Sequence, residues 1–368
     1  MRDKPEGPLR RGWTTGACAT AATRAAYSAL LTGQFPDPVT ITLPRGERPA
    51  FALAREALGD GQAMAGIVKD AGDDPDVTHR ALVLATVRRG PPGSGVSFRA
   101  GEGVGTVTKP GLPLAVGEPA INPVPRRMMQ ETVAELAAAH GDAGDLEIEI
   151  AVPGGAALAA KTWNPRLGIV GGLSILGTTG IVHPFSCSAW IHSIHRGIDV
   201  ARAEGLGHIA GATGSTSEAA VKAHFGLPDY ALIDMGDFAG GMLKYLRAHP
   251  VPRVTIAGGF AKIAKLAQGA LDLHSGRSQV DFDRLAARLA EAGADAGLVA
   301  AARSANTAAE VAAQAAHAGV PLASLVAAQA RAAAAAVMRG APVGLGVMIV
   351  GRDGTISAHA EPPATADV

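Results

Sequence analysis

Apolar and polar positions follow two different rhythms along the chain, and the rhythm changes near Asn164. In the first part, short runs rich in Val, Ile and Thr alternate with Pro, Gly and Asp turns, which is typical of an antiparallel sheet. Helix formers bounded by Thr14 or Thr15 and by Gly33 predict a capped first helix. The predicted elements are a helix at 16–32, strands between 39 and 107, a helix at 125–139 and a strictly alternating strand at 146–152.

After Asn164 the pattern becomes strand, Gly-containing turn and helix, which predicts a parallel sheet covered by helices, with ligands at the carboxyl ends of its strands. The predicted strands are 167–170, 208–212, 230–235 and 254–257, followed by Ala-rich helices over 284–339, a strand at 344–350 and a turn into 355–357. We expect the final Pro/Ala tail to be disordered.

These patterns predict two domains, which agrees with 368 residues being too many for one ordinary core. We expect residues 1–160 to form an α+β domain, an antiparallel sheet with helices, whose loops face the substrate. We expect residues 161–368 to form an α/β domain with a mainly parallel sheet, Ala-rich helices and Gly-rich loops at the strand ends.

Composition narrows the function. The 33 Lys+Arg balance 33 Asp+Glu, so no global basic field attracts nucleic acid or anionic lipid. Only Cys18 and Cys187 are present, which gives no disulfide framework. The charged N-terminus at 1–5 lacks the apolar core of a signal peptide, and no apolar run spans a bilayer. We expect a cytoplasmic protein that binds neither nucleic acid nor membrane.

The densest group of glycines and hydroxyls extends over 168–182, directly after a predicted strand. Such a loop exposes N–H groups and small donors to a carboxylate, phosphate or ribose. Close packing of a strand against a helix is the alternative explanation. The segment is neither a Walker A loop nor a GxGxxG fingerprint. The candidate ligand contacts are Gly171, Gly172, Ser174, Gly177, Thr178, Thr179 and Gly180.

A separate GxGxG string at 101–105 is followed by Pro110, which cannot open a helix, so a dinucleotide site fails there. Two explanations stay open: a strand-turn-strand with Lys109 facing a ligand, and a purely structural hairpin.

The loop 69–79 carries four carboxylates in seven positions between two predicted strands. It lacks the spacing and the closing Glu of an EF-hand. Like charges this close cost stability or raise a pKa. We therefore favour a ligand-facing loop over a metal site or a solvated turn.

Four possible metal ligands lie further along the chain, at His183, Cys187, His192 and His195. Their spacing matches no standard zinc site, so we expect no bound metal. A helix face that carries His192 and His195 three residues apart is the commoner outcome.

In the second domain the loops 211–218 and 235–241 each follow a strand and repeat the small-polar composition. Loops gathered at one sheet edge would surround a single crevice with the Gly-rich segment. An acid such as Glu218 or Asp237 would hold ribose hydroxyls, or would only interact with a helix dipole. The candidate contacts here are Gly214, Glu218, Met235, Gly236 and Asp237.

Several sequence segments, taken together in their order along the chain, identify a protein family more specifically than any one of them does. Over residues 11 to about 276 the chain resembles the CbiD family, through 11–22, 69–79, 103–112, 117–127, 164–182, 213–218 and 235–238. Three positions depart from the family pattern as we expect it: Arg80 stands where we expect Gly, and the loops around Ser215 and Gly259 lack the expected basic and His-Pro-Gly residues.

The resemblance implies methylation at C1 of cobalt-precorrin-5B, giving cobalt-precorrin-6A, with S-adenosyl-L-methionine as cofactor and the Gly-rich contacts as its site. It also implies a fold unlike the other corrin-ring methyltransferases. The corrin precursor carries many carboxylates, for which Arg and Lys are natural anchors. The implied substrate contacts are Thr14, Thr15, Lys109, Arg126, Arg127 and Arg166, and the candidate proton acceptors are Asp70, Asp73, Asp74 and His79.

Two rival functions stay open: a tetrapyrrole carrier without catalysis, and a nucleotide-dependent oxidoreductase that uses the parallel sheet. Binding of S-adenosylhomocysteine without binding of NAD(P)H would favour the methyltransferase. A homo-oligomer is compatible with the sequence.

Overall fold

A computed structural model describes residues 7–362. The charged N-terminal segment and the Pro/Ala tail considered above lie outside the described residues. None of the helices within 7–362 combines the length and the apolar character needed to cross a membrane. By its contacts the chain divides into two compact units, residues 1–187 and 188–368.

The first unit is built around a five-stranded sheet in the order β4-β5-β6-β9-β7. All neighbours are antiparallel except β7 and β9, which are parallel. The elements of this unit are β1 (Gly12–Trp13), α1 (Thr15–Thr32), β2 (Val39–Thr40), β3 (Ala50–Phe51), β4 (Arg55–Gly59), β5 (Gln62–Val68), β6 (Leu82–Arg89), β7 (Val96–Ala100), β8 (Thr106–Val107), α2 (Pro123–His140), β9 (Leu146–Ala151), α3 (Gly155–Ala159), β10 (Ile169–Val170) and β11 (Ile181–Val182).

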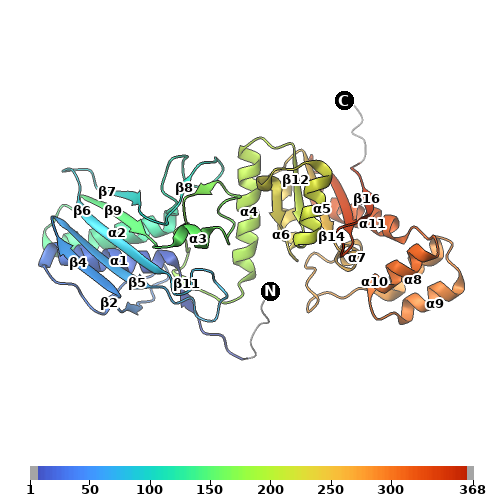
Figure 1. Ribbon diagram of the computed structural model, residues 1–368, viewed down its shortest axis with the longest axis horizontal. Coiled ribbons are helices and arrows are strands. Elements are labelled where there is room, and N and C mark those ends of the chain that lie inside the picture. The colour runs from blue at the N-terminus through green and yellow to red at the C-terminus, as the bar shows by residue number, and fades with distance from the viewer. Residues whose placement is uncertain (1–6, 363–368) are drawn as a thin grey trace. The chain divides into compact units, whose positions relative to one another are not determined.

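Helix α1 lies at the centre of the first unit, against β5 and β6 on one side and α2 on the other (Figure 1). Its small residues allow this close approach, and most of them are buried. Thr14 caps its start by accepting the N–H of Ala17, and Gly33 ends it in the left-handed conformation. The predicted first helix and its caps are therefore confirmed.

The second unit contains a second five-stranded sheet in the order β13-β12-β14-β15-β16. It is parallel except for β16, which pairs antiparallel with β15 and places the C-terminal hairpin in this sheet. The elements are α4 (Cys187–Ala203), which begins at the last residue of the first unit, β12 (His208–Ala212), α5 (Ser215–Phe225), η1 (Asp229–Ala231), β13 (Leu232–Asp234), α6 (Ala239–Ala248), β14 (Arg253–Gly258), α7 (Phe260–Ala267), α8 (Phe282–Glu291), α9 (Ala296–Ser304), α10 (Ala308–His317), α11 (Leu322–Met338), β15 (Gly344–Val350) and β16 (Ile356–Ala360).

Alternate residues of the parallel strands enter two separate cores. On one face Val254, Ile256 and Val347 pack with the helices α4, α6, α7 and α11. On the other face Ala257 and Met348 pack with Val221 of α5. Helices thus cover both faces, as expected for a parallel sheet, and the predicted fold class, α+β followed by α/β, is confirmed.

The segment 161–187 differs from its prediction. We expected the strand near 167–170 to begin the parallel sheet, but β10 pairs antiparallel with β8 in a separate two-stranded ladder of the first unit. The run is too short and too closely followed by glycines to be a central parallel strand. The Gly-rich segment therefore belongs to the first unit, and the predicted single crevice that it shares with the loops of the parallel sheet is not formed at one sheet edge.

Candidate functional site

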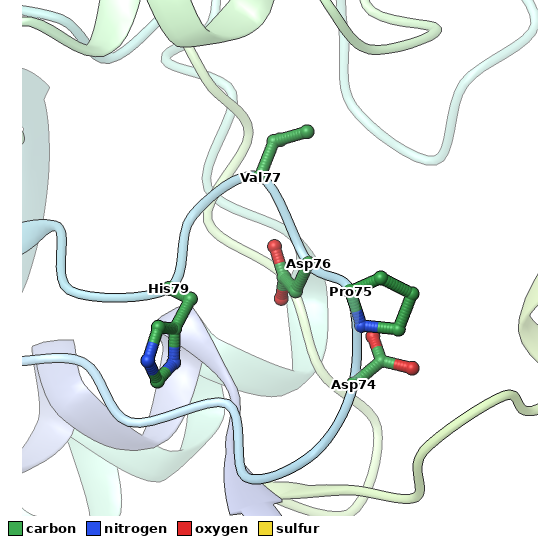
Figure 2. Close-up of a pocket in the computed structure, with 5 residues that line it drawn as sticks. All are labelled: Asp74, Pro75, Asp76, Val77 and His79. Atoms are coloured by element: carbon green, nitrogen blue, oxygen red, sulfur yellow. The ribbon is translucent and has the colours of Figure 1, made fainter. Parts of the chain in front are cut away.

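The acidic loop between β5 and β6 surrounds a hollow with a volume of about 480 Å³. Its lining is Asp74, Pro75, Asp76, Val77 and His79, and Figure 2 shows the Val77 side chain directed away from the His79 side of the loop. The base of the loop is closed by two backbone hydrogen bonds, from the Arg80 N–H to the Lys69 carbonyl and from the Lys69 N–H to the Ala81 carbonyl. Of the four predicted proton acceptors, Asp74 and His79 line the hollow and Asp70 and Asp73 do not.

Asp70 and Asp73 are held by Arg10. The Arg10 guanidinium binds the Asp70 carboxylate, and its backbone N–H donates to Asp73 Oδ2 at 2.6 Å. The hydrogen bonds from Arg10 lower the pKa of Asp70 to about 2. Asp70 is therefore a poor proton acceptor near neutral pH, which argues against its predicted catalytic role.

Asp74 has the opposite environment. Burial raises the pKa of its carboxyl, and the negative charge of Asp76 acts in the same direction, against a hydrogen bond from the Phe185 N–H at 2.8 Å. A raised pKa makes a carboxylate a better proton acceptor. Among the predicted acceptors, Asp74 is the one whose surroundings fit that role best.

His79 lies at the other end of the hollow. Its Nδ1 accepts the N–H of Ala71 at 3.1 Å, so the ring proton of the neutral imidazole is on Nε2. His79 can therefore donate a hydrogen bond from Nε2 in its neutral form.

The Gly-rich segment packs against the start of α1. The Thr15 hydroxyl exchanges hydrogen bonds with the backbone of Leu176, at 3.2 Å to the carbonyl and 3.0 Å from the N–H. Thr14 and Thr15 are buried. Both predicted substrate contacts therefore use their hydroxyls to hold this segment and the helix.

Glycine in this segment serves close packing at three positions. A Cβ on Gly172 would lie 2.2 Å from the Gly103 backbone, and a Cβ on Gly177 would lie 2.3 Å from Thr14 Oγ1. A Cβ on Gly180 would lie 2.5 Å from Leu43. A side chain at any of these three positions would collide with protein atoms, so packing accounts for glycine there. Ser174 is also buried, where its hydroxyl donates to Asn164, and Thr179 bonds the backbone of Ile181. Of the predicted contacts here, Gly171 and Thr178 are exposed.

The carboxyl ends of the parallel strands form a second candidate site, within the second unit. Lys262, in α7, donates to the carbonyl of Thr213 at 3.0 Å and lies 3.0 Å from Asp237 Oδ1. It thereby joins the loops that follow β12 and β13. Asp237 Oδ1 is buried, and the Lys262 ammonium is its ion-pair partner.

The other predicted contacts at this edge differ in access. Gly214 is exposed and precedes α5, and Glu218 lies in the first turn of that helix. Gly236 has positive φ and its Cα faces the Trp190 ring, where a Cβ would lie 3.3 Å away. The side chain of Met235 is fully buried in the core.

The basic residues predicted to bind the substrate carboxylates differ in how many contacts they make within the protein. Arg126 donates to the carbonyls of Ile121 and Pro119 and pairs with Glu118, so it holds its own chain. Arg127 is exposed and 4.0 Å from Glu131. Arg166 lies over the Trp163 ring, 5.3 Å from its centroid. The aliphatic part of Lys109 packs against Gly168, where a Cβ would lie 2.4 Å from it.

The histidines near α4 have ring partners. His195 stacks on Tyr245 with 3.9 Å between centroids, and His192 lies beside His195, both on α4 as the spacing predicted. Within residues 7–362, no group of three or more His, Cys, Asp or Glu side chains is arranged to hold a metal ion.

Lys69 and Asp76 were not selected from the sequence. The strand β5 carried the signal, because Ala63, Ala65 and Ile67 are buried and the same two-residue period places Lys69 inside. A cation on the buried side of a strand demands a partner, and the neighbouring acidic loop supplies one.

Fold and site together define a two-unit protein with a carboxylate-lined hollow in one unit and a strand-end site with helix N-termini in the other. Comparison with known sequences identifies the protein family. The profile of the family CbiD matches residues 2–184, and that of the CbiD C-terminal domain matches residues 272–361. The chain belongs to the CbiD family.

Curated relatives match nearly the whole chain. A cobalt-precorrin-5B C(1)-methyltransferase of Paramagnetospirillum magneticum is 66% identical over 351 residues, 95% of this chain and 98% of the relative. The protein of the same name from Brucella anthropi is 62% identical, over 97% of each chain. A crystal structure of cobalamin biosynthesis protein (cbiD) from Archaeoglobus fulgidus, 28% identical, covers 69% of this chain and 78% of its own with a TM-score of 0.40.

Proposed function

We propose that this protein is a cobalt-precorrin-5B C1-methyltransferase, which transfers a methyl group from S-adenosyl-L-methionine to C1 and yields cobalt-precorrin-6A. The observation that carries the proposal is the identity of 62–66% to relatives of that name over 95–97% of the chain. A carrier or an oxidoreductase has no comparable support.

The strand-end site of the second unit fits the methyl donor. The ribose of the donor offers hydroxyl groups, and the Asp237 carboxylate, which pairs with Lys262 through its buried Oδ1, offers acceptor oxygens. The exposed backbone around Gly214, at the start of α5, offers N–H groups to the donor's carboxylate. When bound, S-adenosylmethionine supplies an electrophilic methyl group. We assign the donor contacts to Gly214, Glu218, Gly236 and Asp237, while Gly171 and Thr178 stay candidates.

The acidic hollow of the first unit fits a role in proton transfer. Addition of a methyl cation gives the macrocycle one positive charge, and loss of a proton restores the original charge. Asp74 accepts that proton in our proposal, and His79 donates a hydrogen bond from Nε2 to a substrate oxygen. The exposed cation Arg127, with Lys109 and Arg166, is assigned to the substrate carboxylates.

The decisive experiment incubates the purified protein with cobalt-precorrin-5B and methyl-labelled S-adenosylmethionine. We expect the label in the macrocycle and one equivalent of S-adenosylhomocysteine. A macrocycle that binds tightly but stays unlabelled would support a carrier, and binding of NAD(P)H without binding of S-adenosylhomocysteine would support an oxidoreductase.

The assignment of the donor site has its own test. Replacement Asp237→Asn is expected to weaken S-adenosylhomocysteine binding at least tenfold by calorimetry, because a charged acceptor of ribose hydroxyls becomes neutral. The matched control Asp229→Asn removes an exposed carboxylate of the same unit that pairs with Lys222. Equal affinity of the two variants would remove Asp237 from the donor site.

A further inference from the structure

A fully buried cation lies beneath the acidic hollow. The Lys69 side chain is 1% exposed, and its Nζ donates to Asp76 Oδ2 at 2.6 Å. Removing two charges from water is costly, and apolar residues of similar volume in place of a buried ion pair often leave a protein equally or more stable. Stability alone therefore gives little reason for an ion pair here.

Asp76 has donors on both of its oxygens. Besides the Lys69 ammonium on Oδ2, the N–H and the hydroxyl of Thr78 donate to Oδ1 at 2.7 and 2.6 Å. Burial opposes ionisation of Asp76, but the Lys69 charge and these hydrogen bonds prevail and lower its pKa. Asp76 is thus a fixed anion in the wall of the hollow.

Asp74, two residues earlier, lines the same hollow with a different set of contacts. The structure gives its carboxyl one hydrogen bond, from the backbone of Phe185, in place of the three donors around Asp76. The charge of Asp76 disfavours ionisation of Asp74, and the charge of Lys69 favours it to a smaller extent. The hollow therefore holds two carboxyls in opposed environments, an arrangement that assigns acid and base roles in enzymes.

We propose that Lys69 is a positioning residue: by holding Asp76 as a fixed anion, it leaves Asp74 as the carboxyl of the hollow that takes up the proton released on methylation. This inference rests on the proposed function. The electron pair of C1 forms the new carbon–carbon bond, and the sulfur keeps the pair of the broken bond. Asp74 then accepts a proton from the macrocycle, which retains the C–H electron pair.

The test measures how two neighbouring charges move the titration of Asp74. In Lys69→Met, a favourable charge is removed, so Asp74 should titrate at higher pH. In Asp76→Asn, an unfavourable charge is removed while the side-chain volume is kept, so Asp74 should titrate at lower pH. We expect opposite displacements of about half a pH unit or more.

Two readouts follow these displacements. The first is the acid limb of the kcat profile at saturating cobalt-precorrin-5B and S-adenosylmethionine, with KM recorded separately. The second is the carbon-13 NMR titration of labelled Asp carboxyls in the free enzyme, with Asp74 assigned through Asp74→Asn. Lys69→Arg, which keeps the cation, should keep the wild-type limb. If Lys69→Met does not fold, the downward shift in Asp76→Asn tests the inference by itself.

The control variant Arg24→Met breaks an ion pair between α1 and α2 in the same unit. It should change stability and leave the acid limb in place. If Lys69→Met and Asp76→Asn behave like this control, losing stability without moving the limb or the titration, the pair is structural and the inference is wrong. Absence of methyl transfer by the wild-type enzyme would instead refute the proposed function, while the NMR titration would still report on Lys69.

Discussion

Stability should fall as the pH is lowered from about 6.5 toward 4, because His208 stays neutral in the folded protein. Burial first, then the charges of Arg253 and His359, lower the pKa of His208 from 6.5 to about 4. Its Nε2 lies 2.9 Å from the Thr255 hydroxyl of β14, and its ring packs on Phe225 of α5.

The neighbouring charged groups act in the same window. His359 of β16 also has a pKa lowered by burial, although Glu361 opposes this shift, and its ring faces His224 of α5. Arg253 pairs with Glu361 at 2.6 Å. The Glu361 carboxylate is thus already engaged, by Arg253 and by His359 at 3.1 Å.

The sign and the magnitude follow from proton linkage. A histidine with a depressed folded pKa contributes its full stability above the unfolded pKa, and loses it as the pH falls toward the folded pKa. With values of 6.5 and about 4, the unfolded state gains roughly 2 kcal/mol relative to the folded state at about pH 5. Partial exposure of the ring makes this an upper bound.

Urea unfolding of the wild type and of His208→Gln, at several pH values between about 7.5 and 4.5, isolates this contribution. Glutamine keeps a partner for Thr255 but does not titrate. We expect the stability difference between the two proteins to shrink by up to about 2.5 kcal/mol over this range. A difference that stays constant with pH would refute the reasoning. Asp70 and Asp142, whose pKa values are lowered to about 2, lose their contribution only at lower pH.

Three further outcomes are expected, all measured as free energies of unfolding in urea. Gly177→Ala should cost about 2 kcal/mol or more, because the added Cβ would collide with Thr14. Gly171→Ala, also at positive φ but with open space around the Cβ, should cost about 1 kcal/mol. Equal costs for the two variants would show that the collision with Thr14 does not matter. Thr14→Ala should cost about 1 kcal/mol through loss of the cap of α1, and an unchanged stability would contradict that role. Arg80→Gly should be stabilising by up to about 1 kcal/mol, because Arg80 has φ of 65°, and a destabilised variant would mean that its side chain makes a larger contribution.

Local patterns predicted the elements well. The caps at Thr14 and Gly33 and the period of two in 146–152 act within a few residues, so they could be recognised without the fold. The expectation of Gly at position 80 is also explained, since the backbone there is left-handed.

Partners distant in the chain could not be predicted. The antiparallel pairing of β10 with β8 joins residues more than 60 positions apart, and a two-residue apolar run does not specify its partner. Likewise, nothing local indicates that Gly172 packs on Gly103 or that Arg10 holds Asp70 and Asp73. Sequence therefore located the acidic loop but not which of its carboxyls face the hollow.

The hydrogen bond from the Phe185 N–H links the protonation of Asp74 to the backbone conformation at Phe185. Phe185, which is held at a φ of 56°, lies two residues before the last residue of the first unit. A left-handed conformation of a bulky residue is strained and needs outside support, which the carboxylate of Asp74 supplies. Protonation of Asp74 weakens that support. Each proton that Asp74 takes up would therefore weaken the hold on the Phe185 backbone, near the end of the first unit. Asp74 would thus fix the course of the chain there as well as accept the proton.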